Sequence, residues 1–447
     1  DVYKRQRFLF LIYFNGDKMD RKNIFVKVFT CISIIFLLTN YSYVFADDIE
    51  STDDNIDVLY EIEDNENDTI ETNSTDVSSL NLNARSCIVL DRLSKKTLYG
   101  KNEYNKVKMA STTKIMTATI IIENCDLSKT IEVSKKAAST GGSRLGLKTG
   151  DKITIRDLLY GLLLRSGNDA AVALAETCGG NIQGFCELMN TKAKELGLSN
   201  THFESPHGLD SEEHYTTAYE LALLTDYALK NPTFSQIVGT QNYTVTINGY
   251  SKNLNNTNEL LGYLDGVYGV KTGFTNGANR CLVSACKRGD MDVICVVLGC
   301  DTKKFRTNDS IKLIKYAFEN FEYVNMNELI NKEFTKWKNE NENYFNINKG
   351  ISSHLEIKYS EPETPIIPIK KSDIESVKIN IYMTKNFEAP IYENTLLGNI
   401  EVTSNNGFIL HSDILANNMI KKKNFFDYTL EFFKSYSNCL NSIPESI

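Results

Sequence analysis

The sequence predicts an α+β fold with a largely antiparallel sheet, followed by a small all-β domain. Within residues 81–325, strand-like segments lie at both ends and helix-like segments lie between them. This order differs from the alternating strands and helices that build parallel sheets. The chain has 447 residues, of which 42% are hydrophobic and 24% are charged. It therefore has the composition of a globular protein and the length of several domains.

The predicted elements of this first domain follow in chain order. Residues 84–90 form an apolar strand, and a turn leads to a second strand at 97–99. Residues 109–124 are apolar on nearly every side, as in a buried helix. The remaining elements are helices at 156–164, 170–177 and 218–229, strands at 281–286 and 292–298 with a hairpin turn at 288–290, and a helix at 310–321.

The composition changes after residue 325. Short strand candidates at 377–383 and 398–402 are separated by polar turns and by a proline-rich segment at 361–365. Proline and polar turn residues end strands, so this pattern favours several short strands over long helices. We therefore predict a small all-β domain over residues 326–413.

The N-terminal region has the pattern of a targeting segment. Met19 is the expected initiator, and residues 1–18 are excluded from the fold as a remnant from outside the natural protein. Residues 19–46 combine a basic start, an apolar run at 28–38 and a small-x-small site, which predicts a secretory signal peptide. A retained membrane anchor is the alternative, but a span needs about 20 apolar residues. We expect an extracytoplasmic protein.

The negative charge of the chain is concentrated in one segment. Residues 47–80 contain thirteen acidic and no basic residues, whereas the whole chain has a net charge of −8. The segment has few large apolar side chains and is predicted to be a disordered acidic linker. The remaining body is almost neutral, which argues against a nucleic-acid-binding protein.

The C-terminal residues 414–447 are predicted to contain an amphipathic helix that attaches the protein to a membrane surface. Three lysines at 421–423 precede it and could be attracted to anionic lipid. Its polar face comprises Asp427, Glu431, Lys434, Asn438 and Asn441, and its apolar face comprises Phe425, Phe426, Leu430, Phe432, Phe433, Tyr436 and Leu440. The alternative is a helix packed on the neighbouring domain.

The cysteines and histidines do not form a recognisable metal motif. Of ten cysteines, nine remain once the signal peptide is removed, and an odd number cannot pair fully within one chain. Whether any of them pair stays open. Those at 281, 286, 295 and 300 lie in apolar strands and are expected to act as small hydrophobic residues. His207 and His214 lie in a loop without further ligand types, so no metal and no cofactor are predicted.

Three short motifs carry the predicted chemistry. Residues 111–114 read Ser-Thr-Thr-Lys, residues 166–168 read Ser-Gly-Asn, and residues 271–273 read Lys-Thr-Gly. This ordered set resembles the signature of penicillin-binding proteins and serine β-lactamases. The serine positions 111 and 166 are 55 residues apart, and 105 residues separate position 166 from 271.

Each motif alone has little specificity, because the chain repeats all three. A second S-x-x-K lies at 284–287, and a second K-T-G lies at 148–150. S-x-N recurs at 251–253 and 404–406. The copy at 284–287 is in a predicted strand, where residues three apart point to opposite faces. Only the ordered set with fitting local structure therefore predicts a catalytic site.

The residue types in the ordered set suit nucleophilic catalysis. Ser111 and Lys114 lie three apart at the start of a helix, so their side chains share one face. A serine hydroxyl needs a base, and lysine serves only when its pKa falls below the usual value of about 10.4. Burial or the nearby charge of Lys271 would lower it. Ser166 can relay a proton and Asn168 can orient the lysine, while Lys271 and Thr272 suit a substrate carboxylate.

The sequence resembles the D-alanyl-D-alanine carboxypeptidases, the low-molecular-mass penicillin-binding proteins of peptidase family S11. The resemblance covers about residues 84–325 and is carried by the segments 108–117, 163–171, 206–209, 215–218 and 269–275. It implies a catalytic domain like those of β-lactamases and penicillin-binding proteins over residues 81–325. More loosely, it extends to the β domain and the terminal helix.

The resemblance also implies roles for individual residues. Ser111 would form the acyl-enzyme and Lys114 would accept its proton, with Ser166 and Asn168 completing the network. The expected substrate-binding residues are Lys271, Thr272, Gly273 and Phe274. Lys271 would bind the terminal carboxylate, and the backbone N–H groups of Ser111 and Phe274 would bind the oxyanion. The implied partners are peptidoglycan stem peptides ending in D-Ala-D-Ala and β-lactams that acylate the serine.

Two other functions remain as alternatives. A serine β-lactamase would need a base for rapid deacylation, but its usual E-x-x-x-N loop is not evident after Asn168. Glu204 lies in a suitable stretch, yet Gly208 occupies the fourth position after it. A non-catalytic penicillin-binding or wall-binding module would have no need of the complete set of catalytic residue types.

Overall fold

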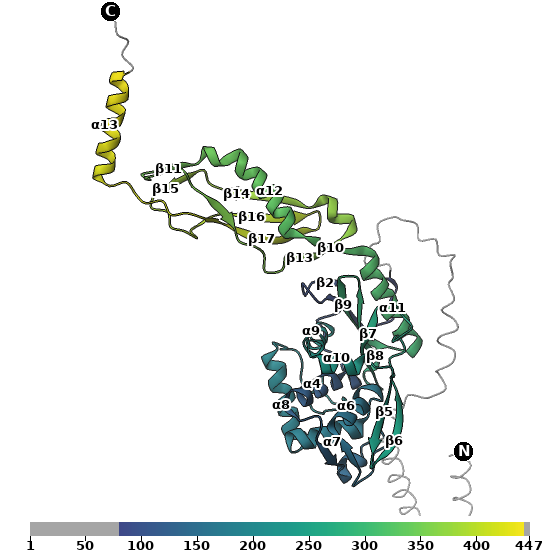
Figure 1. The fold of residues 1–447 in the computed structure, drawn as a ribbon. Coiled ribbons are helices and arrows are strands. Elements are labelled where there is room, and N and C mark those ends of the chain that lie inside the picture. Colours follow the sequence, from purple (N-terminus) through teal and green to yellow (C-terminus); the bar gives the residue numbers. More distant parts are fainter. Residues whose placement is uncertain (1–79, 442–447) are drawn as a thin grey trace, which may run out of the picture.

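The computed structural model describes residues 80–441. A large α+β domain comes first along the chain, a smaller β domain follows, and the terminal helix α13 (Phe425–Asn441) projects beyond it (Figure 1). The predicted remnant at 1–18, the signal peptide at 19–46 and the acidic linker up to residue 79 lie outside the described residues.

A five-stranded antiparallel sheet forms the centre of the large domain, as predicted. Its strands are ordered β2-β1-β9-β8-β7, so β7 lies at one edge. Their bounds are β1 Ser86–Asp91, β2 Thr97–Lys101, β7 Val267–Thr275, β8 Asn279–Arg288 and β9 Met291–Cys300. The turn between β8 and β9 contains Gly289 with a φ of 57°, a conformation that glycine adopts without strain.

Helices cover both faces of the sheet. On one face lies a cluster of α4 to α10, and on the other lies α11 (Figure 1). Alternate residues of β1 enter the two cores, because successive strand side chains point to opposite faces: Ile88 faces the helical cluster and Val89 faces α11. The helices are α4 Lys114–Asn124, α5 Lys135–Ala138, α6 Ile155–Leu164, α7 Asn168–Gly179, α8 Ile182–Glu195, α9 Ala218–Leu229, α10 Pro232–Val238 and α11 Lys303–Asn320.

Some of these elements differ from the sequence prediction. The predicted helix at 109–124 is divided into the 3₁₀ turn η3 (Ala110–Thr113) and α4. α11 begins seven residues before the predicted 310, because Thr302 caps it by accepting a hydrogen bond from the Phe305 N–H. α8 was not predicted, because most of its residues are polar or small and it buries only four side chains. Two small antiparallel sheets were also not predicted: β3 (Thr130–Glu132) with β4 (Lys152–Thr154), and the hairpin of β5 (Asn242–Ile247) and β6 (Tyr250–Asn255).

The second domain is a β domain with its own core, but it is not built of strands alone. It contains the helix α12 (Met326–Asn341), which was not predicted from the sequence and which buries Met326, Ile330 and Phe334. A four-stranded antiparallel sheet has the order β12-β17-β16-β14. The strands are β10 Phe321–Asn325, β11 Asn346–Asn348, β12 Ile357–Tyr359, β13 Ile366–Lys370, β14 Lys378–Met383, β15 Asn386–Glu388, β16 Leu396–Ser404 and β17 Gly407–Ala416.

The C-terminal boundary of this domain lies later than residue 413. β17 continues to Ala416, and Ile420 pairs with Ile391. The chain still contacts the domain up to residue 423, where the Lys423 N–H donates to the Lys349 carbonyl oxygen at 2.7 Å, and the terminal helix begins at Phe425. Between residues 80 and 441, no helix is both long enough and apolar enough to cross a membrane.

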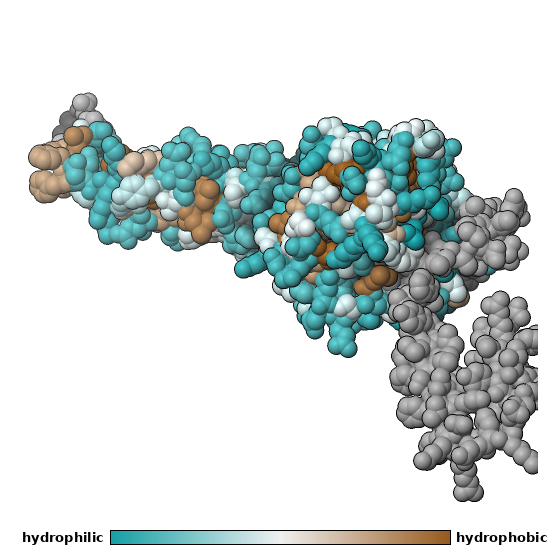
Figure 2. All heavy atoms as spheres, turned by 90° about the horizontal axis from the view of Figure 1, so that it is seen from below, coloured by the Kyte–Doolittle hydropathy of each residue, from teal (hydrophilic) through white to brown (hydrophobic). Residues whose placement is uncertain are grey.

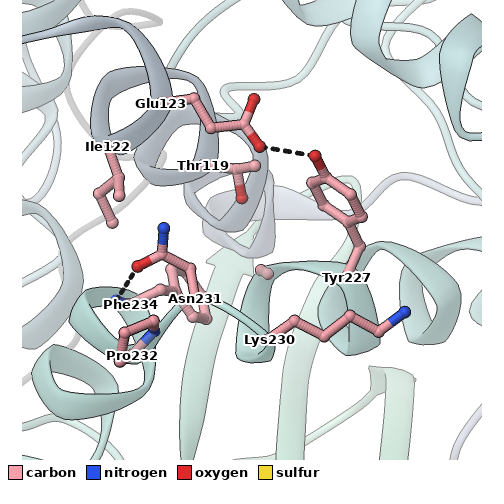
Figure 3. Close-up of a pocket in the computed structure, with 9 residues that line it drawn as sticks. Thr119, Ile122, Glu123, Tyr227, Lys230, Asn231, Pro232 and Phe234 are labelled. Atoms are coloured by element: carbon pink, nitrogen blue, oxygen red, sulfur yellow. Dashed lines mark hydrogen bonds between the residues drawn. The ribbon is translucent and has the colours of Figure 1, made fainter.

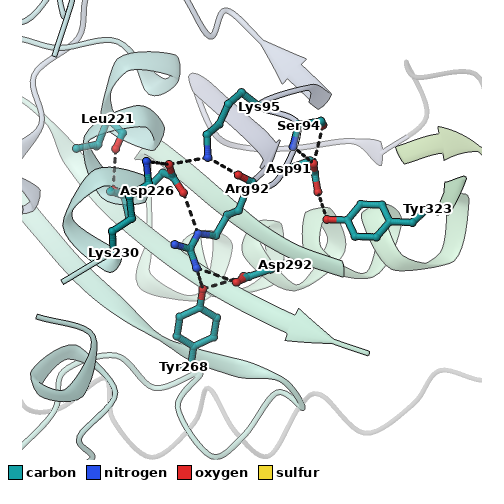
Figure 4. A network of polar contacts seen from close by, with 11 residues as sticks. Asp91, Arg92, Ser94, Lys95, Leu221, Asp226, Lys230, Tyr268, Asp292 and Tyr323 are labelled. Carbon is teal, nitrogen blue, oxygen red and sulfur yellow. Dashed lines mark hydrogen bonds and ion pairs between the residues drawn. The ribbon is translucent and has the colours of Figure 1, made fainter. Parts of the chain in front are cut away.

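A polar network around Arg92 holds several elements of the large domain together (Figure 4). The Arg92 guanidinium pairs with Asp226 of α9 at 3.0 Å and with Asp292 of β9 at 2.7 Å, and it donates to the Tyr268 hydroxyl of β7 at 2.8 Å. Beside it, Tyr323 of β10 donates to Asp91 at 2.6 Å, which links the β domain to β1. The network thereby fixes the first residues of the edge strand β7 against the sheet.

Candidate active site

The predicted nucleophile lies in a tight turn at the entrance of α4. Ser111 is in the 3₁₀ turn η3, and only 3% of its surface is exposed. Ala110 before it has a φ of 47°, which is strained for a residue with a side chain. The turn places Ser111 above Lys114, whose Nζ is 2.6 Å from the serine Oγ. The predicted pairing of these two residues is therefore present.

Lys114 is completely buried and has four neutral neighbours within hydrogen-bond distance. Its Nζ is 2.7 Å from Asn168 Oδ1 and 3.0 Å from the carbonyl oxygen of His207. These two oxygens can only accept, so they take the two hydrogens of a neutral amine. The remaining lone pair can then accept the proton of Ser111. Ser166 Oγ, at 3.3 Å, is the second hydroxyl at this nitrogen.

The second motif lies in the break between α6 and α7. Ser166 has a φ of 56°, and Asn168 is the first residue of α7. The Asn168 amide nitrogen donates to the carbonyl oxygen of Gly141 at 2.9 Å, which leaves its oxygen facing Lys114. Asp169, next in sequence, accepts backbone N–H groups of residues 145–147. The loop that orients Asn168 is therefore itself held by α7.

The third motif lies on the edge strand β7, next to the nucleophile. The Nζ of Lys271 donates to the Thr272 carbonyl oxygen at 2.8 Å, and only 1% of the lysine is exposed. The Thr272 hydroxyl is 2.8 Å from that of Thr257. A Cβ on Gly273 would lie 3.2 Å from the backbone nitrogen of Ser111. Only glycine lets β7 approach the turn this closely without displacement.

The loop that contains Gly208 and His214 supports the nucleophile turn. Gly208 has a φ of 88°, and a Cβ there would lie 1.9 Å from the Ala110 carbonyl oxygen. The ring of His214 is 2.8 Å from the Thr113 hydroxyl and accepts the Glu204 N–H on its other nitrogen at 3.0 Å. Burial lowers the pKa of His214 to about 4, so the ring is neutral and donates to Thr113.

The same burial affects His207, whose carbonyl oxygen contacts Lys114. Burial lowers the pKa of His207 to about 3. Both histidines therefore act here as neutral packing and positioning groups. Across residues 80–441 no three or more His, Cys, Asp and Glu side chains gather in a way that could hold a metal ion.

The structure separates the ordered motifs from their repeats. Ser284 is completely buried in β8 whereas Lys287 is exposed, as expected for residues three apart in a strand. Lys148, in the second K-T-G, is also exposed. Ser111, Lys114, Ser166 and Asn168 are brought together in one site, and β7 places Gly273 against the nucleophile turn.

A separate hollow lies at the other end of α4 (Figure 3). It has a volume of about 290 Å³ and lies between α4, α9 and α10. Tyr227 donates to Glu123 at 2.7 Å at its rim. None of the three motifs contributes a residue to it, so it is distinct from the candidate active site.

Comparison with known proteins decides the family. The sequence matches the D-alanyl-D-alanine carboxypeptidases of peptidase family S11 over residues 72–302, which is more than half of the chain. The chain belongs to this family. The predicted family and enzyme class are therefore confirmed, and the protein is an S11 D-alanyl-D-alanine carboxypeptidase, a serine peptidase that acts on peptidoglycan.

Relatives of this S11 carboxypeptidase cover both of its domains. D-alanyl-D-alanine carboxypeptidase DacF of Bacillus subtilis is 36% identical over 357 residues, which are 78% of this chain and 89% of the relative. The crystal structure of DacD from Francisella tularensis superposes with a TM-score of 0.63 at 28% identity, covering 76% of this chain and 94% of that one. The structure of penicillin-binding protein 5 from Haemophilus influenzae superposes with a TM-score of 0.61 at 25% identity, and it covers 76% of this chain and 98% of that one. The predicted fold class is confirmed.

Proposed function

We propose that this carboxypeptidase removes the terminal D-Ala of a peptidoglycan stem peptide through an acyl-enzyme on Ser111. The Ser111 oxygen attacks the carbonyl carbon of the penultimate D-Ala while its proton moves to Lys114 Nζ. The tetrahedral intermediate then collapses, and the proton passes to the leaving D-Ala amine through Ser166. A water molecule hydrolyses the acyl-enzyme in a second step that uses the same base.

One observation carries this proposal, the set of contacts at Lys114 Nζ. The two oxygens that can only accept, from Asn168 and His207, occupy two directions around the nitrogen, and the Ser111 hydroxyl lies 2.6 Å away in a third. This arrangement suits a neutral amine that accepts a proton. Asn168 therefore acts as a positioning residue for the base as well as a predicted contact of the substrate.

The substrate carboxylate is proposed to bind at Lys271 and Thr272. Both side chains are buried on the edge strand beside Ser111, so a charge pair there is little screened by solvent. The backbone N–H groups of Ser111 and Phe274 are proposed to bind the oxyanion, with Gly273 allowing the close approach of the two segments. β-Lactams are proposed to acylate the same serine.

The test is a paired assay on purified protein without residues 1–46. We expect release of D-Ala from a diacyl-D-Ala-D-Ala peptide, and a stable penicillin adduct on the peptide that contains Ser111. Rapid turnover of penicillin without D-Ala release would instead identify a serine β-lactamase. No turnover and no adduct would identify a binding module. Glu204, the candidate base for deacylation, is exposed, whereas the catalytic residues are buried.

We also propose that the protein is exported and attached to the outer face of the cell membrane through α13. In this helix no residue from Phe425 to Asn438 is buried, and its aromatic side chains form an apolar end of the molecule (Figure 2). Phe425 is 79% exposed and Phe432 is 67% exposed. The lysines at 421–423 precede this surface and suit anionic headgroups. The alternative, in which α13 packs on the β domain, would bury part of this helix and is not supported by the exposed side chains.

Deletion of residues 421–447 is expected to move the protein from the membrane fraction to the soluble fraction, because the apolar helix and its lysines are lost. Binding to vesicles with and without anionic lipid, measured by sedimentation, checks this. A matched variant with Lys421, Lys422 and Lys423 changed to glutamine should lose mainly the dependence on anionic lipid. Equal membrane binding of the deletion variant would refute the attachment.

A further inference from the structure

Two half-buried cysteines lie together at the end of the catalytic domain opposite to the nucleophile. Cys125 is the residue that ends α4, and Cys178 lies in the last turn of α7. Both pack at the margin of the same hydrophobic core. Their side chains are neighbours, and burial together with the adjacent Cys125 raises the pKa of Cys178 to about 12.

The helices that carry these cysteines also carry the catalytic residues. α4 begins at Lys114 and α7 begins at Asn168, and these two side chains meet at 2.7 Å. The two helices therefore lie side by side and run in the same direction, with the active site at one pair of ends and the cysteine pair at the other. At 1.5 Å per residue the two pairs of ends are roughly 16 Å apart.

The other described cysteines have different surroundings. Eight cysteines are free thiols in the structure: Cys87, Cys125, Cys178, Cys186, Cys281, Cys286, Cys295 and Cys300. All except Cys125 and Cys178 are buried. Four of them, at 87, 286, 295 and 300, face the core around α11, and Cys281 faces the helical cluster on the other side of the sheet. Burial gives an oxidant little access to these thiols. Only Cys125 and Cys178 of this set combine partial exposure with a neighbouring thiol.

We propose that Cys125 and Cys178 form a redox-active pair, which an external disulfide oxidises to an intramolecular disulfide that ties the ends of α4 and α7. One cysteine loses its proton and attacks a sulfur of the external disulfide, which releases one thiol and leaves a mixed disulfide. The other cysteine then loses its proton and attacks the bound sulfur, which releases the second thiol. The two cysteines are oxidised by two electrons, and the external disulfide is reduced to two thiols.

This pair has a structural rather than a catalytic consequence. The link would close a loop of about 50 residues that contains α5, α6 and most of α7, and it would restrict the unfolded chain. Because it lies far from Lys114, it should leave the catalytic contacts intact. Extracytoplasmic export, proposed above, would place the pair where disulfides persist, although its formation in the purified protein does not depend on that.

The test is oxidation of the full-length protein, purified under reducing conditions, with graded oxidised glutathione. We expect the loss of two thiols in a titration of the denatured protein, and one pair of peptides joined between Cys125 and Cys178 with the mass of two hydrogens missing. The midpoint of thermal unfolding should rise by roughly 5–10 °C. Reduction should reverse both changes.

Variants make the assignment specific. Cys125→Ser should form no intramolecular link, whereas Cys186→Ser, the matched change at a cysteine of α8, should lose the same two thiols as the wild type. Separate glutathione adducts on Cys125 and Cys178 without a link would overturn the proposal. A link between other cysteines, or one that lowers the unfolding midpoint, would overturn it as well.

Discussion

Replacing Lys114 by alanine is expected to slow acylation of Ser111 by about 10²–10⁴-fold, the usual contribution of a general base. The nitrogen that lies 2.6 Å from the serine oxygen is then missing. The rate of labelling by a fluorescent penicillin, followed over time, measures the effect. Ser111→Ala should give no adduct at all.

The chain supplies its own matched control for this experiment. Lys287 stands three residues after Ser284 in the repeated S-x-x-K, but it is exposed on β8. Lys287→Ala should therefore leave the labelling rate unchanged. An equal loss in both lysine variants would indicate a general effect on folding or charge. Undiminished labelling of Lys114→Ala would show that Lys114 is not the base.

Replacing Lys271 by alanine is expected to lower kcat/KM for a peptide with a free terminal carboxylate by roughly 10–100-fold, because a charge-assisted hydrogen bond is lost. The distinguishing measurement uses a second peptide whose C-terminus is an amide. The wild type should strongly prefer the carboxylate, and the variant should lose most of this preference. A structural defect alone would lower both activities and leave the preference in place.

The control for this variant is Lys148→Ala in the repeated K-T-G. Lys148 is exposed in a turn where its backbone N–H donates to the Asp151 carboxylate at 2.7 Å, and loss of its side chain should change neither peptide's rate. A variant with Lys271→Arg retains the positive charge and should recover part of the preference for carboxylate. If Lys271→Ala keeps the wild-type preference, the carboxylate binds elsewhere.

The sequence predicted the structure best where residues close together in the chain determine the type of element or the contact. Strands such as β9 and helices such as α4 are dense in apolar residues, and their type follows from that density and from their length. Ser111 and Lys114 are three positions apart, which places their side chains on one face of any helical turn. Their contact could therefore be predicted from their spacing alone.

The sequence did not predict helices with few apolar residues, nor contacts between residues that lie far apart in the chain. α8 buries four of its fourteen residues and α12 buries three of its sixteen, so neither has the density of apolar residues that α4 has. The supporting roles of Gly208 and His214 depend on contacts with Ala110 and Thr113 about a hundred positions earlier. The proximity of Cys125 to Cys178 likewise could not be predicted from any local sequence pattern.

The sequence by itself determined the family and the enzyme class and predicted the reacting residues, because these depend on residue types in a fixed order. Only the tertiary structure decided which copies of the motifs come together, because burial and proximity separate Lys114 from Lys287. It also decided how Lys114 can serve as a base. That property requires oxygens from Asn168 and His207, which the chain brings to one nitrogen only when it folds.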